Sequence, residues 1–116
     1  MVKDFGGWEK IMQVSFAAAV SGIQAVITRE NVSANNVANI TTPGFSQTDA
    51  IQTAMSPQGV QISALRKTPN PDPQASNTDL TKEMVNQVQN KNELAADVKV
   101  IQTQDKMMGS LLDIVA

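Results

Sequence analysis

The sequence predicts a mainly α protein whose two long terminal helices form an antiparallel hairpin or coiled coil. A short β-hairpin and a Pro-rich loop join the two helices. Two observations support this fold class. All five prolines lie between residues 43 and 73, and the segments on either side have apolar residues at three- and four-residue spacing. A chain of 116 residues is the size of one domain, so we expect residues 1–116 to form a single unit.

The N-terminal helix is predicted over residues 8–40. This segment has no proline and contains one glycine, Gly22. Breaker residues bound the segment on both sides, with Gly6-Gly7 before it and Thr41-Thr42-Pro43-Gly44 after it.

The middle zone, residues 44–78, is predicted to contain a β-hairpin and a linker. Apolar and polar residues alternate around Ile51 and Met55 and again around Val60 and Ile62. Between the two runs, Ser56-Pro57-Gln58-Gly59 is a good turn sequence. Residues 67–78 contain three prolines, which indicates an extended linker.

The C-terminal helix is predicted over residues 79–115, which again lack proline. Asn77, Thr78 and Asp79 are all candidate N-caps, and Glu83 suits the first turn because the positive end of the helix dipole favours an acid there. A helix of this length spans roughly 50 Å.

Each helix carries two apolar stripes when its residues are projected at about 100° per residue. In the N-terminal helix the stripes contain Phe16, Val20, Ile23, Ile27, Ala34 and Val37, and on the opposite side Ile11, Val14, Ala18, Gly22 and Ala25. In the C-terminal helix they contain Leu80, Met84, Val88, Ala95, Val98, Ile101, Met108 and Leu112, with Lys91 and Asp105 as interruptions, and behind them Val85, Ala96, Val100, Met107, Leu111 and Ile114.

A helical hairpin needs only one apolar stripe per helix, and a second stripe exposed to water lowers solubility. We therefore expect one stripe to pair within the chain and the other to meet neighbouring subunits. The alternative is an ordinary small bundle, or a dimer, whose helices are buried on two sides. The residues predicted to pack between subunits are Ala18, Gly22, Ala25, Ile23, Ile27, Val37, Met84, Val98, Ile101, Met108, Leu111 and Leu112.

The composition excludes several classes of function. The chain has no His and no Cys, so it lacks the usual ligands of zinc, copper, haem and iron–sulfur centres and the partners of a Ser-His-Asp or Cys-His site. A net charge of −2 argues against binding to nucleic acid. The acids Asp72, Asp79 and Glu83 lie at a linker and a helix start, where they serve solubility and capping. We expect no enzyme activity, no metal and no cofactor.

The sequence also bears on location. It has no run of 18 apolar residues, so we expect no membrane-spanning helix. The N-terminus lacks the basic and long apolar regions of a cleaved secretory signal.

Four asparagines, Asn31, Asn35, Asn36 and Asn39, lie within an arc of about 140° on the N-terminal helix. Because Asn is a mediocre helix former, so many on one face is unusual. One interpretation is a solvated face near a fraying helix end. The other is that their amides bond to backbone groups where the helix ends, at a subunit junction.

Residues 21–47 resemble the N-terminal signature of the bacterial flagellar basal-body rod and hook protein family. The matching residues are Ser33, Asn36, Val37, Ala38, Asn39, Thr42, Pro43, Gly44 and Phe45. The C-terminal segment resembles the other end of the same family, through Glu83, Met84, Val85, Lys99, Ile101, Thr103, Asp105, Met108 and Leu112. Departures are the absence of Tyr over residues 90–96 and the presence of residues 1–8, which lie outside the pattern.

The resemblance implies a structural subunit of the flagellar rod that self-assembles through its terminal helices and serves motility. The short middle zone makes the chain most like a small proximal rod protein. The implied partners are copies of the chain, other flagellar rod or axial proteins and the flagellar export machinery. The implied location is the periplasmic rod of the basal body, reached by type III export without a cleaved signal peptide. An alternative is a helical adaptor of the export apparatus that is not part of the rod.

Overall fold

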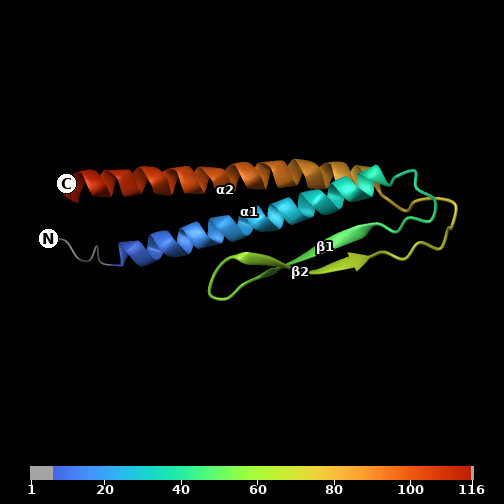
Figure 1. Cartoon of the computed structure of the whole chain (residues 1–116), viewed down its shortest axis with the longest axis horizontal. Helices are drawn as coiled ribbons and strands as arrows, with labels where there is room; N and C mark the ends of the chain where they lie inside the picture. The colour runs from blue at the N-terminus through green and yellow to red at the C-terminus, as the bar shows by residue number, and fades with distance from the viewer. Residues whose placement is uncertain (1–6, 116) are drawn as a thin grey trace.

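The computed structural model describes residues 7–115 and confirms the predicted fold class. It contains α1 (Trp8–Ala38), β1 (Thr48–Ala54), β2 (Val60–Lys67) and α2 (Leu80–Val115). The body is elongated, at 70 × 23 × 14 Å. The two helices run antiparallel, and α1 lies between α2 and the β-hairpin (Figure 1). Residues 1–6, part of the segment outside the family pattern, lie outside the described residues.

The residues on either side of α1 explain where the helix begins and ends. It starts after Gly7, whose φ of 91° is readily adopted only by glycine. It ends two residues before the predicted end because Asn39 turns back on the helix. The Asn39 side-chain amide donates to the carbonyl of Asn35 (2.8 Å), and its side-chain oxygen accepts from the Thr42 hydroxyl (3.0 Å).

The β-hairpin pairs β1 with β2 in antiparallel register, from Thr48 opposite Lys67 to Ala54 opposite Val60. A bulge follows Ile51. The turn is fixed to α1, because the backbone N–H of Val60 donates to the Ser21 hydroxyl at 3.1 Å. The hairpin therefore lies along α1, as Figure 1 shows.

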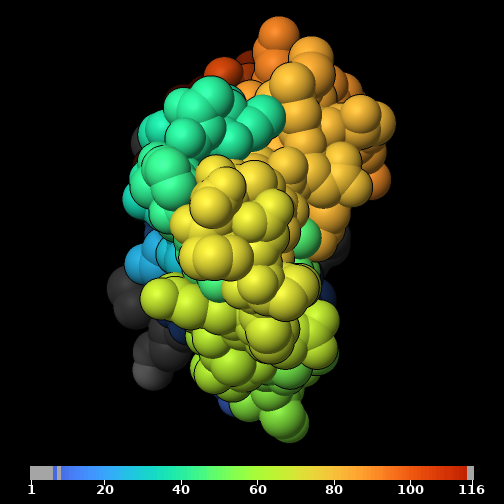
Figure 2. Space-filling view, turned by 90° about the vertical axis from the view of Figure 1, so that its right-hand side faces the viewer, coloured from blue at the N-terminus to red at the C-terminus, as the bar shows by residue number. Residues whose placement is uncertain are grey.

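The linker between β2 and α2 differs from the free, extended segment expected. The Asn70 side chain donates to the carbonyls of Phe45 (2.8 Å) and Ala75 (2.6 Å), and the N–H of Gly44 donates to the same Ala75 carbonyl. Figure 2 shows this segment, in yellow, lying against the end of the molecule between the residues that follow α1 and the start of α2. Asparagine hydrogen bonds thus order a segment whose prolines leave it few backbone donors.

The start of α2 selects one of the three candidate N-caps. Asp79 accepts the backbone N–H of Lys82 at 3.2 Å and so caps the helix. Thr78 instead donates to the carbonyl of Asn36 at 3.0 Å, and the Asn77 side chain bonds to the linker.

By length and composition alone, α1 is apolar enough over Glu9–Ala38 to cross a membrane, although no unbroken apolar run of that length exists. A packed helix of a soluble protein meets the same criterion. Because α1 packs against both α2 and the β-hairpin, the absence of a membrane span stays our prediction.

Substituting Gly59 tests the contact between the turn and α1. Gly59 has a φ of 94°, and an added Cβ would lie 2.7 Å from the Ser21 hydroxyl oxygen. We expect Gly59→Ala to lower the free energy of unfolding by about 1–2 kcal/mol in urea denaturation. The control is Gly109→Ala, a helical site with nothing within 4 Å, which should gain about 0.5–1 kcal/mol. Equal effects at the two sites would contradict the prediction.

Candidate assembly interface

The contact between α1 and α2, here called the polar seam, follows a seven-residue repeat. On α2 the repeat places Glu83, Asn90, Asp97 and Gln104 toward α1. Glu83 and Asn90 are buried, Asp97 and Gln104 half-buried. On α1 the buried residues with the same repeat are Met12, Ala19, Val26 and Ser33. The spacing is that of a coiled coil, but one side of the seam is polar.

Asn36 lies at the centre of the best-bonded part of the polar seam and is 0% exposed. Its side-chain nitrogen donates to the carbonyl of Thr48 (2.7 Å) and to a carboxylate oxygen of Glu83 (3.1 Å). Its side-chain oxygen accepts the backbone N–H of Thr48 at 2.9 Å. The amide thus pairs with the first residue of β1 as a neighbouring strand would, and it joins α1, β1 and α2 at one point.

Glu83 is 1% exposed and is surrounded by polar groups. One carboxylate oxygen accepts from Asn36, and the other is buried with no hydrogen-bond partner among the residues that the structure describes. Next to it, the Gln87 side chain donates to the Ser33 hydroxyl (3.2 Å), which donates to the Glu83 carbonyl (3.4 Å). Burial of a carboxylate is costly unless it is bonded, so the polar seam depends on these neighbours.

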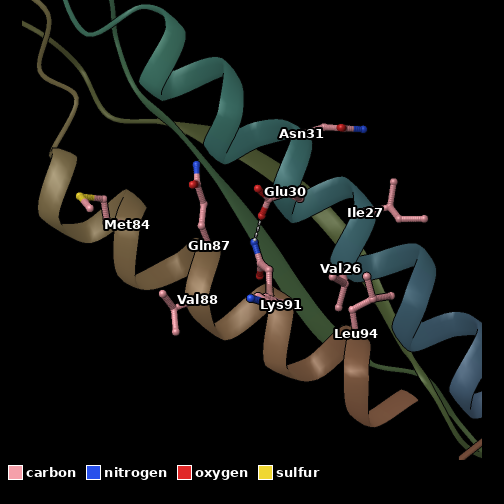
Figure 3. Close-up of a pocket in the computed structure, with 10 residues that line it drawn as sticks. Val26, Ile27, Glu30, Asn31, Met84, Gln87, Val88, Lys91 and Leu94 are labelled. Atoms are coloured by element: carbon pink, nitrogen blue, oxygen red, sulfur yellow. Dashed lines mark hydrogen bonds between the residues drawn. The ribbon is translucent and has the colours of Figure 1, made fainter. Parts of the chain in front are cut away.

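Charged groups continue the polar seam toward the chain ends. Asn90 donates to the Glu30 carboxylate at 2.9 Å, the contact that Figure 3 marks with a dashed line. Arg29 forms an ion pair with Glu93. Asp97 packs over Gly22, where an added Cβ would lie 2.7 Å from a carboxylate oxygen. Burial raises the pKa of Asp97, the Glu93 carboxylate raises it further, and Arg29 opposes the rise.

The apolar side chains of α2 are found mainly on its outer surface. Val88 is 60% exposed and Leu112 is 63% exposed. The other large apolar residues of α2 that are exposed are Leu80, Met84, Val85, Leu94, Val98, Val100, Met107, Met108 and Ile114, and those of α1 are Ile11, Val14, Phe16 and Ile27.

The expectation that one apolar stripe of α2 pairs with α1 is therefore wrong. Both stripes are mostly exposed, and the polar row between them makes the contact. The physical reason is that Glu83 and Asn90 find hydrogen-bond partners on α1, and Gly22 lets the helices approach. An apolar surface of this extent marks an interaction site.

A groove between the helices carries part of this apolar surface. Val26, Ile27, Met84, Val88 and Leu94 supply its apolar walls, and Glu30, Asn31, Gln87, Asn90 and Lys91 supply polar groups. Figure 3 shows Met84, Val88 and Leu94 on α2 and Val26 and Ile27 on α1. Among residues 7–115 no group of three or more acidic side chains could hold a metal ion. The apolar walls of the groove suit contacts with other proteins.

Residues 74–114 match the family model described as the flagellar basal body rod FlgEFG protein C-terminal region. This segment of the chain is similar to the C-terminal region of flagellar basal-body rod proteins. No curated protein matches the chain significantly. The matched range contains the last residues of the linker and all but the last residue of α2, including Glu83 and the outer apolar stripes. The match confirms the resemblance found in the C-terminal part of the sequence, and it supports a structural role in the flagellar basal body in general.

The structure gives most residues of the rod family's N-terminal motif a bonding role. Ser33, Asn36, Asn39 and Thr42 all make side-chain hydrogen bonds. Gly44 has a φ of 74° and, like Phe45, bonds through its backbone, whereas Ala38 and Pro43 are exposed. The backbone bonding expected by the second interpretation is found for Asn36 and Asn39, and the subunit junction that it also expects stays a prediction. Asn31 and Asn35 are exposed, as the first interpretation expects.

The residues predicted to pack between rod subunits fall into three groups. Five are exposed, namely Ile27, Met84, Val98, Met108 and Leu112, and six are half-buried, namely Ala18, Gly22, Ile23, Val37, Ile101 and Leu111. Ala25 is buried within the chain, and Gly22 serves the contact with α2. Contacts of these residues between subunits remain a prediction.

Sequence reasoning missed the polar residues that complete the site. Thr48 supplies the backbone groups for Asn36, Gln47 accepts the N–H of Asp79 (3.1 Å), and Asn77 accepts the N–H of Gln47 (2.7 Å). The sequence signal that could have indicated these residues is the presence of Asn and Gln in the non-helical segments between the two helices.

We expect Asn36→Ala to lower the free energy of unfolding by about 2–4 kcal/mol. The substitution leaves both backbone groups of Thr48 and a buried oxygen of Glu83 without their partner, and each unpaired buried group costs about 1–3 kcal/mol. Urea denaturation measures the change. Asn35→Ala is the matched control, because Asn35 is the adjacent helical residue and is exposed. A similar loss of stability in both variants would show that the buried Asn36 amide contributes no more than an exposed asparagine, and would contradict the prediction.

The pKa of Asp97 gives a pH-dependent prediction. Because its pKa is raised on folding, the folded state binds a proton more readily than the unfolded state, and the ionised carboxylate destabilises the fold above the raised pKa. We expect Asp97→Asn to be more stable than the natural chain at pH 7. That gain should shrink as the pH falls through the carboxylate range. Unfolding midpoints at several pH values test this, and a gain that grows toward acid would have the wrong sign.

Proposed function

We propose that this chain is a self-assembling structural subunit of the flagellar rod that works in motility. The observation that carries the proposal is the exposed apolar surface of α2 in a segment matched by the rod family model. The contact of α2 with α1 is made by polar residues, and most of the large apolar residues of α2 are exposed.

The energetics of the outer surface favour assembly. Each large apolar side chain gains about 1.5–3 kcal/mol when it is fully buried. The internal polar seam supplies little of this gain, because its α2 side consists of Glu83, Asn90, Asp97 and Gln104. Neighbouring subunits that cover the outer surface would therefore complete the burial that the single chain lacks.

The proposed setting is the periplasmic part of the basal body. We propose that the chain reaches it through the flagellar export machinery without a cleaved signal peptide, and that other rod proteins are its partners there. The family match supports the basal body as the location, and the sequence features at the N-terminus support the route.

Deletion of the coding region in a flagellated host tests the proposal. We expect a loss of swimming and basal bodies that lack a complete rod in electron micrographs. Complete rods together with lost secretion would instead favour the export adaptor, and normal basal bodies with normal swimming would contradict both functions.

Complementation of the deletion strain tests the outer surface directly. We expect Val88→Ser with Leu112→Ser to fail to restore swimming while the variant protein keeps its circular dichroism spectrum, because both side chains are exposed in the single chain. The matched control replaces the exposed polar residues Gln89 and Gln102 of the same helix by Ser. Restored swimming with the apolar substitutions would contradict a packing role for these positions.

A further inference from the structure

One line of residues along α2 is its own complement when the helix is reversed end for end. This α2 outer line has five residues at seven-residue spacing, namely Met84, Lys91, Val98, Asp105 and Leu112. Reversal about the central Val98 exchanges Met84 with Leu112 and Lys91 with Asp105. Val98 also lies at the middle of α2 itself (Leu80–Val115). Residues at this spacing stay on one face of a helix in a coiled coil.

The α2 outer line is open to a partner in the single chain. Met84, Val98 and Leu112 are 58%, 40% and 63% exposed. Lys91 and Asp105 are also exposed, and neither side chain forms a hydrogen bond or an ion pair with another residue that the structure describes. A partner that covers the line takes both charges out of water, which is unfavourable unless each meets an opposite charge.

A second copy of the chain, reversed in direction, supplies both opposite charges at once. We propose that two copies pair through antiparallel α2 helices about a two-fold axis at Val98. Lys91 of each copy then faces Asp105 of the other, Met84 faces Leu112, and the two Val98 side chains meet. The β-hairpin leaves room for this contact, because α1 lies between it and α2 (Figure 1).

Other arrangements of two α2 helices match the charges less well. In a parallel pair without a shift, Lys91 meets Lys91 and Asp105 meets Asp105. A parallel pair shifted by two heptads forms one ion pair, leaves one Lys91 and one Asp105 without partners, and shortens the overlap of the helices. An antiparallel pair shifted by one heptad places a charge against Val98. Pairing about Val98 forms two ion pairs and lets the helices overlap along their whole length.

The groove between α1 and α2 adjoins the same face of α2. Met84 and Lys91 line the groove from α2, and Ile27 lines it from α1 (Figure 3). In the antiparallel pair, the end of the partner's α2 that carries Met108 and Leu112 lies beside this groove. Ile27, Met108 and Leu112 are all exposed in the single chain, so the pairing covers apolar surface of both helices.

This dimer is a form of the chain outside the rod. A two-fold contact uses the same surface of both copies and closes on itself, whereas a rod needs a contact that repeats in one direction. The pairing therefore goes beyond the proposed function. It covers the α2 outer line of a chain that has not yet assembled, and it must dissociate before the same surface meets other subunits.

Charge exchange in the full chain tests the pairing in solution. We expect the natural chain to sediment as a dimer in analytical ultracentrifugation. Lys91→Glu alone and Asp105→Lys alone place like charges together, so each should weaken the dimer at least about tenfold, and the double exchange should restore it. Lys99→Glu is the matched control, because Lys99 is an exposed cation of α2 outside the line, and it should leave the dimer unchanged.

Three results of the charge exchange would overturn the pairing. They are a natural chain that sediments as a monomer, single variants that dimerise as tightly as the natural chain, and a double variant that stays dissociated. Circular dichroism of each variant shows whether it keeps its helices, so that a loss of pairing is separated from a loss of folding.

Disulfide trapping tests the direction and register of the pair. The chain has no cysteine, so each variant forms only the bonds it introduces. Val98→Cys alone should give a cross-linked dimer on oxidation, because the two copies of this residue meet at the axis. Met84→Cys alone and Leu112→Cys alone should not, since each residue lies roughly 40 Å from its own copy. A mixture of the last two variants should give a mixed dimer.

Cross-linked dimers from Met84→Cys alone and Leu112→Cys alone would indicate parallel pairing and overturn the proposal, as would the absence of a cross-link in Val98→Cys. Both experiments use the chain in solution. Their failure therefore leaves the proposed rod function standing, and a deletion strain with normal basal bodies and normal swimming would leave the pairing standing.

Discussion

The fold depends on the side-chain amide of Asn36. This one group satisfies both backbone groups of Thr48 and one oxygen of the buried Glu83 carboxylate. The backbone carbonyl of the same residue receives the hydroxyl of Thr78. The end of α1, the first residue of β1, the linker and the first turns of α2 are thus joined at a single residue. An amide can do this because it both donates and accepts, which a carboxylate or an ammonium group cannot.

Around this point the chain separates its polar and apolar residues in an unusual way. The contact between the helices uses amides, carboxylates and a glycine, and the large apolar residues lie outside. Hydrogen bonds between polar groups depend on direction, so they specify how the helices pair more than they add to stability. Apolar contacts depend on area rather than direction, and the chain leaves most of its large apolar residues of α2 exposed. In the single chain, hydrogen bonds specify how the helices pair, but much of the apolar surface is not buried.

The sequence predicts the elements well and the contacts poorly. Both helices, the turn at residues 56–59 and the start of α2 follow from proline, glycine and capping residues, whose effects are local. The polar seam does not follow, because pattern analysis treats Glu83 as a first-turn acid and expects an apolar stripe of α2 to pair with α1, whereas the structure buries Glu83 and Asn90. Their burial depends on Asn36 and Glu30, which lie far away in the chain. The asparagine face was recognised, but its partners could be identified only in three dimensions.

The sequence separation of the contacts of Asn36 has a kinetic consequence. Its bonds to Thr48 span 12 residues, whereas its bond to Glu83 spans 47. Loop-closure entropy favours the shorter contact, so we expect the hairpin to dock on α1 before α2 does. Helix α2 is then the last element to lose its freedom, and it is also the element with the most exposed apolar surface. A newly arrived subunit could therefore choose its neighbour with α2 while the rest of its chain is already folded.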